Sequence, residues 1–113
     1  METAFTVPVL SGKRAALEEL ARQVSGPRKK EYEGSEKKLG LKKETWFIEG
    51  SPNGDVWILY AEGKDLNKSF GDWIASKDPF DVWFKAQVKE ITGIDFNNPP
   101  GSGLPKQVMR YNY

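Results

Sequence analysis

The sequence predicts an α+β fold whose elements follow the order strand, helix, strand, strand, helix, strand (βαββαβ). A β-hairpin pattern occupies residues 44–63, apolar residues alternate near both ends of the chain, and segments with helical spacing of apolar residues separate these regions. A chain of 113 residues has room for one hydrophobic core. We therefore expect residues 1–113 to form a single domain.

The hairpin is the centre of the predicted sheet. Two runs rich in aromatic and β-branched residues, 45–49 and 56–62, flank a turn that contains Asn53-Gly54. Both turn residues tolerate positive φ, which favours a type I′ turn. A two-residue loop at this position would pair Ile48 with Leu59, and a longer loop would shift that register.

The second strand of the hairpin is apolar on both faces. Residues 56–61 include no charged side chain, and such runs are typical of strands that are covered on both sides. The helices of so short a chain can cover one face of a small sheet. We therefore expect a second copy of the same sheet to cover the other face.

The first third of the chain predicts a strand followed by a helix. Residues 3–10 alternate as in a half-buried strand, and Pro8 indicates either a position near a strand end or one without a pairing partner. Ser11 is the expected N-cap of a helix that runs to about Val24, because apolar residues recur at i, i+3, i+4 and i+7 within this segment.

Further helices and a last strand follow from the rest of the sequence. Residues 28–38 are mostly charged and predict a solvated helix, closed by Gly40. Asp65 and Asp78 are the expected N-caps of two more helices with apolar faces. Residues 107–113 alternate again and predict the final strand.

This order of elements is the ferredoxin-like pattern, an antiparallel sheet with helices on one face. The chain also resembles the dimeric α/β-barrel superfamily, in which two such protomers pack sheet against sheet. Within that superfamily it is similar to a group of small bacterial proteins of unassigned function. The segments that carry the resemblance are residues 8–14, 39–40, 44–47 and 78–84.

The resemblance implies a homodimer closed sheet to sheet, and leaves the chemistry open. The superfamily includes cofactor-independent monooxygenases, haem-degrading enzymes and lactone isomerases. Its haem-using members depend on histidine ligands, and this chain has no histidine. We therefore expect this chain to share the fold of the superfamily but not its haem chemistry.

Composition narrows the possible functions. The absence of cysteine and histidine excludes thiol nucleophiles, histidine-based triads and thiolate or imidazole metal sites from this chain, so we expect no metal and no cofactor. Any acid–base catalyst must be Asp, Glu, Lys or Tyr. A net charge of +1, no long apolar run and no signal-peptide pattern predict no nucleic-acid or membrane partner and a cytoplasmic location.

Aromatic residues give the first candidate site. Tyr60, Trp73, Trp83 and Phe84 could close an apolar pocket between sheet and helices that takes a small aromatic or apolar ligand. Such a pocket needs a volume of about 300 Å³ or more. The alternative interpretation is that these rings are core and interface packing.

A carboxylate completes the predicted ligand-binding set. Glu49 lies in a strand with apolar neighbours, and burial there would raise its pKa and make it a general base. The expected function is a homodimer that binds a small ligand, and we lean against catalysis because few side chains suit acid–base work. The alternatives are a regulatory or structural dimer without ligand, and a cofactor-independent monooxygenase-like or isomerase-like enzyme.

Overall fold

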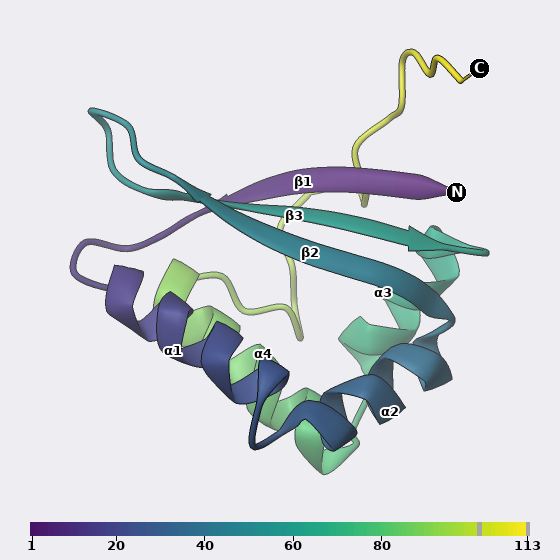
Figure 1. The fold of residues 1–113 in the computed structure, drawn as a ribbon, viewed down its shortest axis with the longest axis horizontal. Coiled ribbons are helices and arrows are strands. Elements are labelled where there is room, and N and C mark those ends of the chain that lie inside the picture. The colour runs from purple at the N-terminus through teal and green to yellow at the C-terminus, as the bar shows by residue number, and fades with distance from the viewer. Residues whose placement is uncertain (102, 113) are drawn as a thin grey trace.

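The computed structural model of the protein describes residues 1–101 and 103–112. In this part of the chain a three-stranded antiparallel sheet carries four helices on one face (Figure 1). The predicted α+β, ferredoxin-like class is confirmed, with each predicted helical region formed by two helices. The elements are β1 (Glu2–Pro8), α1 (Arg14–Ser25), α2 (Lys29–Leu39), β2 (Leu41–Glu49), β3 (Val56–Gly63), α3 (Leu66–Ala75) and α4 (Pro79–Thr92).

The hairpin strand β3 lies in the middle of the sheet, between β1 and β2. Ile48 pairs with Trp57 rather than with Leu59, so the predicted register was wrong by two positions. An even shift leaves every side chain on its predicted face. The side chains of Trp57, Leu59 and Ala61 therefore face the helices, and the alternate residues of β3 face away from them.

The hairpin turn explains the shift. Ser51 and Gly54 exchange two backbone hydrogen bonds, with N···O distances of 3.2 and 3.0 Å, so Pro52 and Asn53 occupy the central positions. No described residue other than glycine has positive φ, which rules out the predicted type I′ turn at Asn53-Gly54. Proline has the φ that the first central position of a common turn requires. The preference of Pro52 for this position prevails over the preference of Asn53-Gly54 for the two central positions.

Of the three predicted N-caps, one is formed and two are not. The side chain of Asp65 accepts a hydrogen bond from the Lys68 amide at 3.2 Å, which confirms this N-cap. Ser11 does not cap α1, because a turn over residues 10–13 intervenes and the helix begins at Arg14. Asp78 precedes α4, but its carboxylate binds Lys38 instead of the helix amides.

The predicted last strand is not formed in the described part of residues 107–113. Residues 107–112 have no regular secondary structure and extend away from the body beyond β1 (Figure 1). The segment contacts the sheet through side chains, since Gln107 and Arg110 both bind the carboxylate of Glu2, at 2.6 and 3.2 Å. Side-chain contacts of this kind do not fix the backbone register that a strand requires.

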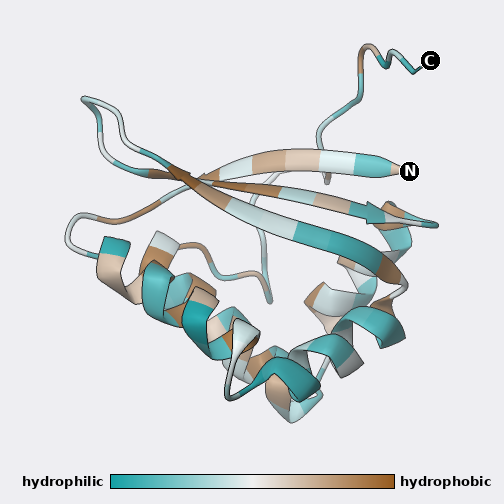
Figure 2. Ribbon diagram, viewed as in Figure 1, coloured by the Kyte–Doolittle hydropathy of each residue, from teal (hydrophilic) through white to brown (hydrophobic). Residues whose placement is uncertain are grey.

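The core lies between the inner face of the sheet and α1 and α4. Leu17, Trp57 and Ile91 are each at most 2% exposed. Figure 2 shows the apolar middle of the sheet above the helices and the largely hydrophilic surface of α2. No helix in the described ranges is long and apolar enough to cross a membrane.

Gly63, at the end of β3, lies close to the backbone of Gly40. A Cβ atom here would lie 2.8 Å from the carbonyl oxygen of Gly40 and 3.1 Å from Leu66 Cδ2. We expect Gly63→Ala to destabilise the fold by about 1–3 kcal/mol in urea denaturation.

The matched control is Gly71→Ala in α3, where a Cβ meets nothing within 4 Å. Alanine should stabilise this helical position by about 0.5–1 kcal/mol. Equal effects of the two substitutions would contradict the close approach at Gly63.

Candidate functional site

A cavity of about 100 Å³ lies between the inner face of the sheet and helices α2, α3 and α4. Most of its lining is apolar and includes the rings of Phe5, Phe70, Trp73 and Phe84. Its volume is well below the 300 Å³ at which pockets for drug-sized ligands begin. The polar residues that line it are Thr3, Tyr32, Ser35, Glu36, Glu44, Ser69 and Asp81.

The structure brings two of the five predicted ligand-binding residues to this cavity. Trp73 and Phe84 line it and meet edge to face, with ring centroids 6.0 Å apart. Trp83 lies outside, where the guanidinium of Arg28 covers its ring at 3.9 Å. The predicted closure of the pocket by Trp83 is therefore corrected.

Strand alternation removes Tyr60 and Glu49 from the cavity. Tyr60 lies on the outer face of β3 and donates a hydrogen bond to Glu62 at 2.6 Å. Glu49 is exposed at the end of β2, so the burial that would make it a general base does not occur. The acidic residues that do line the cavity are Glu36, Glu44 and Asp81, and none of them was among the predicted ligand-binding residues.

Glu36 and Glu44 reach the cavity from the two sides of one tight turn. Gly40 adopts φ +78° and reverses the chain directly from α2 into β2. Leu41 and Glu44 both line the cavity, although a regular strand would send residues three apart to opposite faces. Glu44 faces inward by regular alternation with Trp46 and Ile48, and a bulge between Leu41 and Lys43 absorbs the extra residue, so that Leu41 faces inward as well.

The electrostatics of this carboxyl pair are unusual. Burial, the charge of Glu44 and hydrogen bonding with Glu44 raise the pKa of Glu36 to about 9, and hydrogen bonding with Tyr32 only partly opposes this. Burial and the same two carboxyls also raise the pKa of the Tyr32 phenol. Glu44 accepts a hydrogen bond from Trp46 Nε1 at 2.6 Å. Glu36 is therefore a carboxylic acid at neutral pH.

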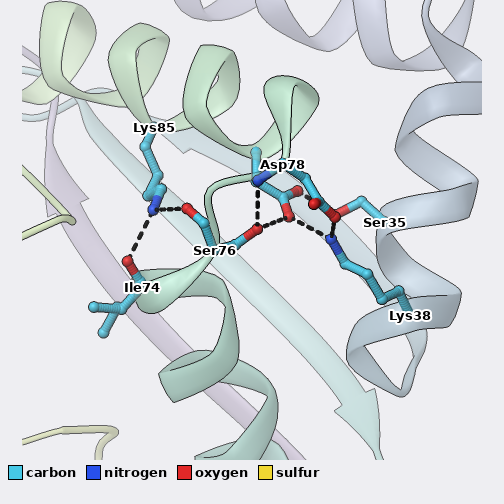
Figure 3. Close-up of polar contacts among 7 residues, drawn as sticks. Ser35, Lys38, Ile74, Ser76, Asp78 and Lys85 are labelled. Carbon is cyan, nitrogen blue, oxygen red and sulfur yellow. Dashed lines mark hydrogen bonds and ion pairs between the residues drawn. The ribbon is translucent and has the colours of Figure 1, made fainter.

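Asp81 anchors the wall of the cavity next to this pair. Its side chain is 1% exposed and accepts hydrogen bonds from Ser35 at 2.5 Å, Ser76 at 2.6 Å and Lys38 at 2.8 Å. Burial alone would raise the pKa of Asp81, but these donors outweigh it and hold the pKa below its ordinary value. The network joins α2 to the segment between α3 and α4 (Figure 3).

Lys85 extends the same network on its other side. Its ammonium group donates to the carbonyl oxygens of Ile74, at 2.8 Å, and Ser76, at 3.0 Å (Figure 3). Burial lowers the pKa of Lys85, and the nearby charge of Lys77 adds to this. The side chain ties α4 to the C-terminal end of α3, which positions Trp73 and Phe84 in the cavity wall.

The raised pKa of Glu36 predicts how stability depends on pH. Above its ordinary pKa of 4.5 the unfolded chain loses a proton that the folded protein keeps until about pH 9. The stabilisation is complete below pH 4.5 and is lost as pH rises through this window, by at most about 1.4 kcal/mol per pH unit. We expect Glu36→Gln to remove this slope in urea denaturation, whereas Glu33→Gln, on the exposed side of α2, should keep it. A flat wild-type profile would contradict the assignment.

No protein-family model matches the chain, and no curated protein matches it significantly. Among solved structures, the chain is similar to the L-rhamnose mutarotase from Formosa agariphila, with a TM-score of 0.64 and 15% sequence identity. The alignment covers 100% of this chain and 99% of that chain. The match supports the ferredoxin-like fold over the whole length, and gives no support to the narrower resemblance to bacterial proteins of unassigned function.

This comparison corrects the functional expectation. The sequence favoured a protein that binds an aromatic or apolar ligand, and weighed against catalysis. The structural neighbour is an enzyme, an L-rhamnose mutarotase, so the expectation that weighed against catalysis is withdrawn.

Proposed function

We propose that this protein is a mutarotase-like enzyme that interconverts the α and β anomers of a small sugar. The observation that carries the proposal is the pair of carboxyls, Glu36 and Glu44, in a small and largely apolar cavity. Anomer interconversion needs an acid and a base at the same time, at two oxygens attached to one carbon. The mutarotase activity of the structural neighbour supports the same reaction class.

Each carboxyl has a defined role in this reaction. Glu44 takes the proton of the anomeric hydroxyl while Glu36 gives its proton to the ring oxygen. The bond between the anomeric carbon and the ring oxygen then breaks, and the sugar opens to an aldehyde. After rotation about the adjacent carbon–carbon bond, the ring closes on the other face and both protons return. The apolar rings around the pair exclude water, which strengthens the electrostatic interactions between enzyme and sugar.

The test is the rate of anomer exchange of L-rhamnose, measured by NMR magnetisation transfer between the two anomeric signals. We expect the wild-type protein to accelerate exchange well above the spontaneous rate in the same buffer. Other aldohexoses serve as the comparison set for specificity. If none of these sugars exchanges faster with the protein than without it, the proposal is wrong.

A homodimer closed sheet to sheet also belongs to the proposal. The helices cover one face of the sheet, and the opposite face presents Phe47, Ile58 and Tyr60, with Phe47 56% exposed. A second copy of this face would cover it by two-fold symmetry.

We expect Phe47→Asp to shift the protein from dimer to monomer in sedimentation equilibrium, because a charge would be buried without a partner. Val82→Asp is the matched control, since Val82 is 46% exposed on α4, away from this face. A wild-type protein that sediments as a monomer would refute the dimer while leaving the reaction untouched.

A further inference from the structure

We infer that the hydroxyl of Thr3 binds a substrate hydroxyl on the side of the sugar ring opposite the reacting carbon. The inference rests on the proposed function and extends it to the substrate. The expected substrate is a six-membered sugar ring with a free hydroxyl at carbon 4. Carbon 4 lies across the ring from the anomeric carbon, so its hydroxyl is the one that would reach Thr3.

The first observation is an unused hydrogen-bonding group. Thr3 Oγ1 is buried and has no hydrogen-bond partner among the residues that the structure describes. Buried polar atoms are almost always paired, because leaving one unpaired costs free energy. Thr3 also lines the cavity, so a ligand there can supply the missing partner.

The second observation is the register of the sheet. Thr3 on β1 and Glu44 on β2 both pair with Ala61 on β3, so these three residues form one row across the inner face. Two strand spacings separate Thr3 from Glu44, about 9.5 Å between their backbones. The small methyl group of Ala61 between them leaves the floor of the cavity open. A sugar ring on this floor has its anomeric hydroxyl toward Glu44 and its far edge toward Thr3.

The other buried atom without a partner is differently placed. Trp57 Nε1 lies two rows further along β3, beyond the row of Phe5 and Leu59. The Trp57 ring packs against Trp46, with centroids 4.9 Å apart. Thr3 is therefore the unpaired group that shares a row with the reactive carboxyl.

The experiment uses Thr3→Val, which keeps the shape of the side chain and removes its hydroxyl. We expect KM for L-rhamnose to rise about tenfold with kcat nearly unchanged. Thermal stability should not fall, because the substitution removes an unpaired buried atom. Thr3→Ser should restore KM, and the matched control Thr6→Val, exposed on the outer face of the same strand, should leave it unchanged.

A 4-deoxy analogue of L-rhamnose makes the assignment specific. With this sugar the wild-type KM should already be raised, and Thr3→Val should add no further loss. An unchanged KM of Thr3→Val for L-rhamnose, or a full tenfold loss that persists with the analogue, would overturn the inference.

A binding measurement separates this inference from the proposed reaction. Chemical-shift titration with L-rhamnose reports binding whether or not the anomers exchange. If wild-type protein binds the sugar without accelerating exchange, and Thr3→Val weakens that binding, the reaction is wrong and the Thr3 contact stands. If the wild-type protein does not bind any six-membered sugar of the comparison set, both are wrong.

Discussion

Replacing Glu36 with glutamine is expected to lower kcat for anomer exchange by about 10²- to 10⁴-fold, the usual contribution of a positioned general acid. Glutamine keeps the size of the side chain and can donate a hydrogen bond, but it cannot transfer a proton to the ring oxygen. KM should change little, because the binding contacts remain. NMR magnetisation transfer on L-rhamnose gives both values.

The matched control for this prediction is Glu33→Gln, which removes a carboxylate from the exposed side of the same helix. It should leave kcat unchanged. The stability of Glu36→Gln should equal or exceed that of the wild type at neutral pH, since burial penalises the carboxylate form of Glu36. If Glu36→Gln keeps the wild-type activity, Glu36 is not the general acid, whatever reaction the protein catalyses.

Asp81→Ala is expected to cost about 2–4 kcal/mol of the free energy of unfolding. The substitution removes the acceptor for Ser35, Ser76 and Lys38 at once and leaves hydroxyls without a partner in the interior. Because the pKa of Asp81 is held below its ordinary value of 3.8, its stabilisation is present above pH 3.8 and is lost as pH falls further. Urea denaturation at neutral pH and near pH 3 measures both effects.

Asp72→Ala is the control for this second prediction. Asp72 binds Lys68 at 2.6 Å in a surface ion pair whose side chains are 50% and 70% exposed. Its loss should cost less than about 1 kcal/mol. Similar costs for Asp72→Ala and Asp81→Ala would show that the buried network contributes no more than a surface pair.

Most of the fold could be predicted because local patterns determine it. Alternation set the faces of the hairpin strands correctly even though the register was wrong, since side-chain direction depends only on parity. The C-terminal strand could not be predicted from alternation alone. A strand also needs a partner edge, and residues 107–112 contact β1 through side chains instead.

The site was harder to predict because its carboxyls lie in charged segments that predict an exposed surface. Glu44 shares a face with Trp46 and Ile48 by strand alternation, but the predicted strand began at residue 45 and left Glu44 out. One signal for Glu36 was available, since Tyr32, Glu36 and Leu39 follow i, i+4, i+7 along one stripe of α2. Because most residues of α2 are charged, the sequence predicted a solvated helix and this stripe was not recognised. Among the predicted aromatic residues on helices, Trp73 and Phe84 line the cavity, whereas Trp83, the residue before Phe84 on α4, does not.

The turn at Gly40 has a consequence for engineering. Tyr32, Glu36 and Glu44 all lie within fifteen consecutive residues, 32–46, so the proposed acid and base form one transplantable cassette. The groups opposite lie outside this segment, on β1 and β3. In the proposed reaction the acid and base therefore lie apart in sequence from the groups that contact the rest of the sugar, and a library that varies β1 and β3 is expected to change the sugar that is bound while residues 32–46 stay unchanged.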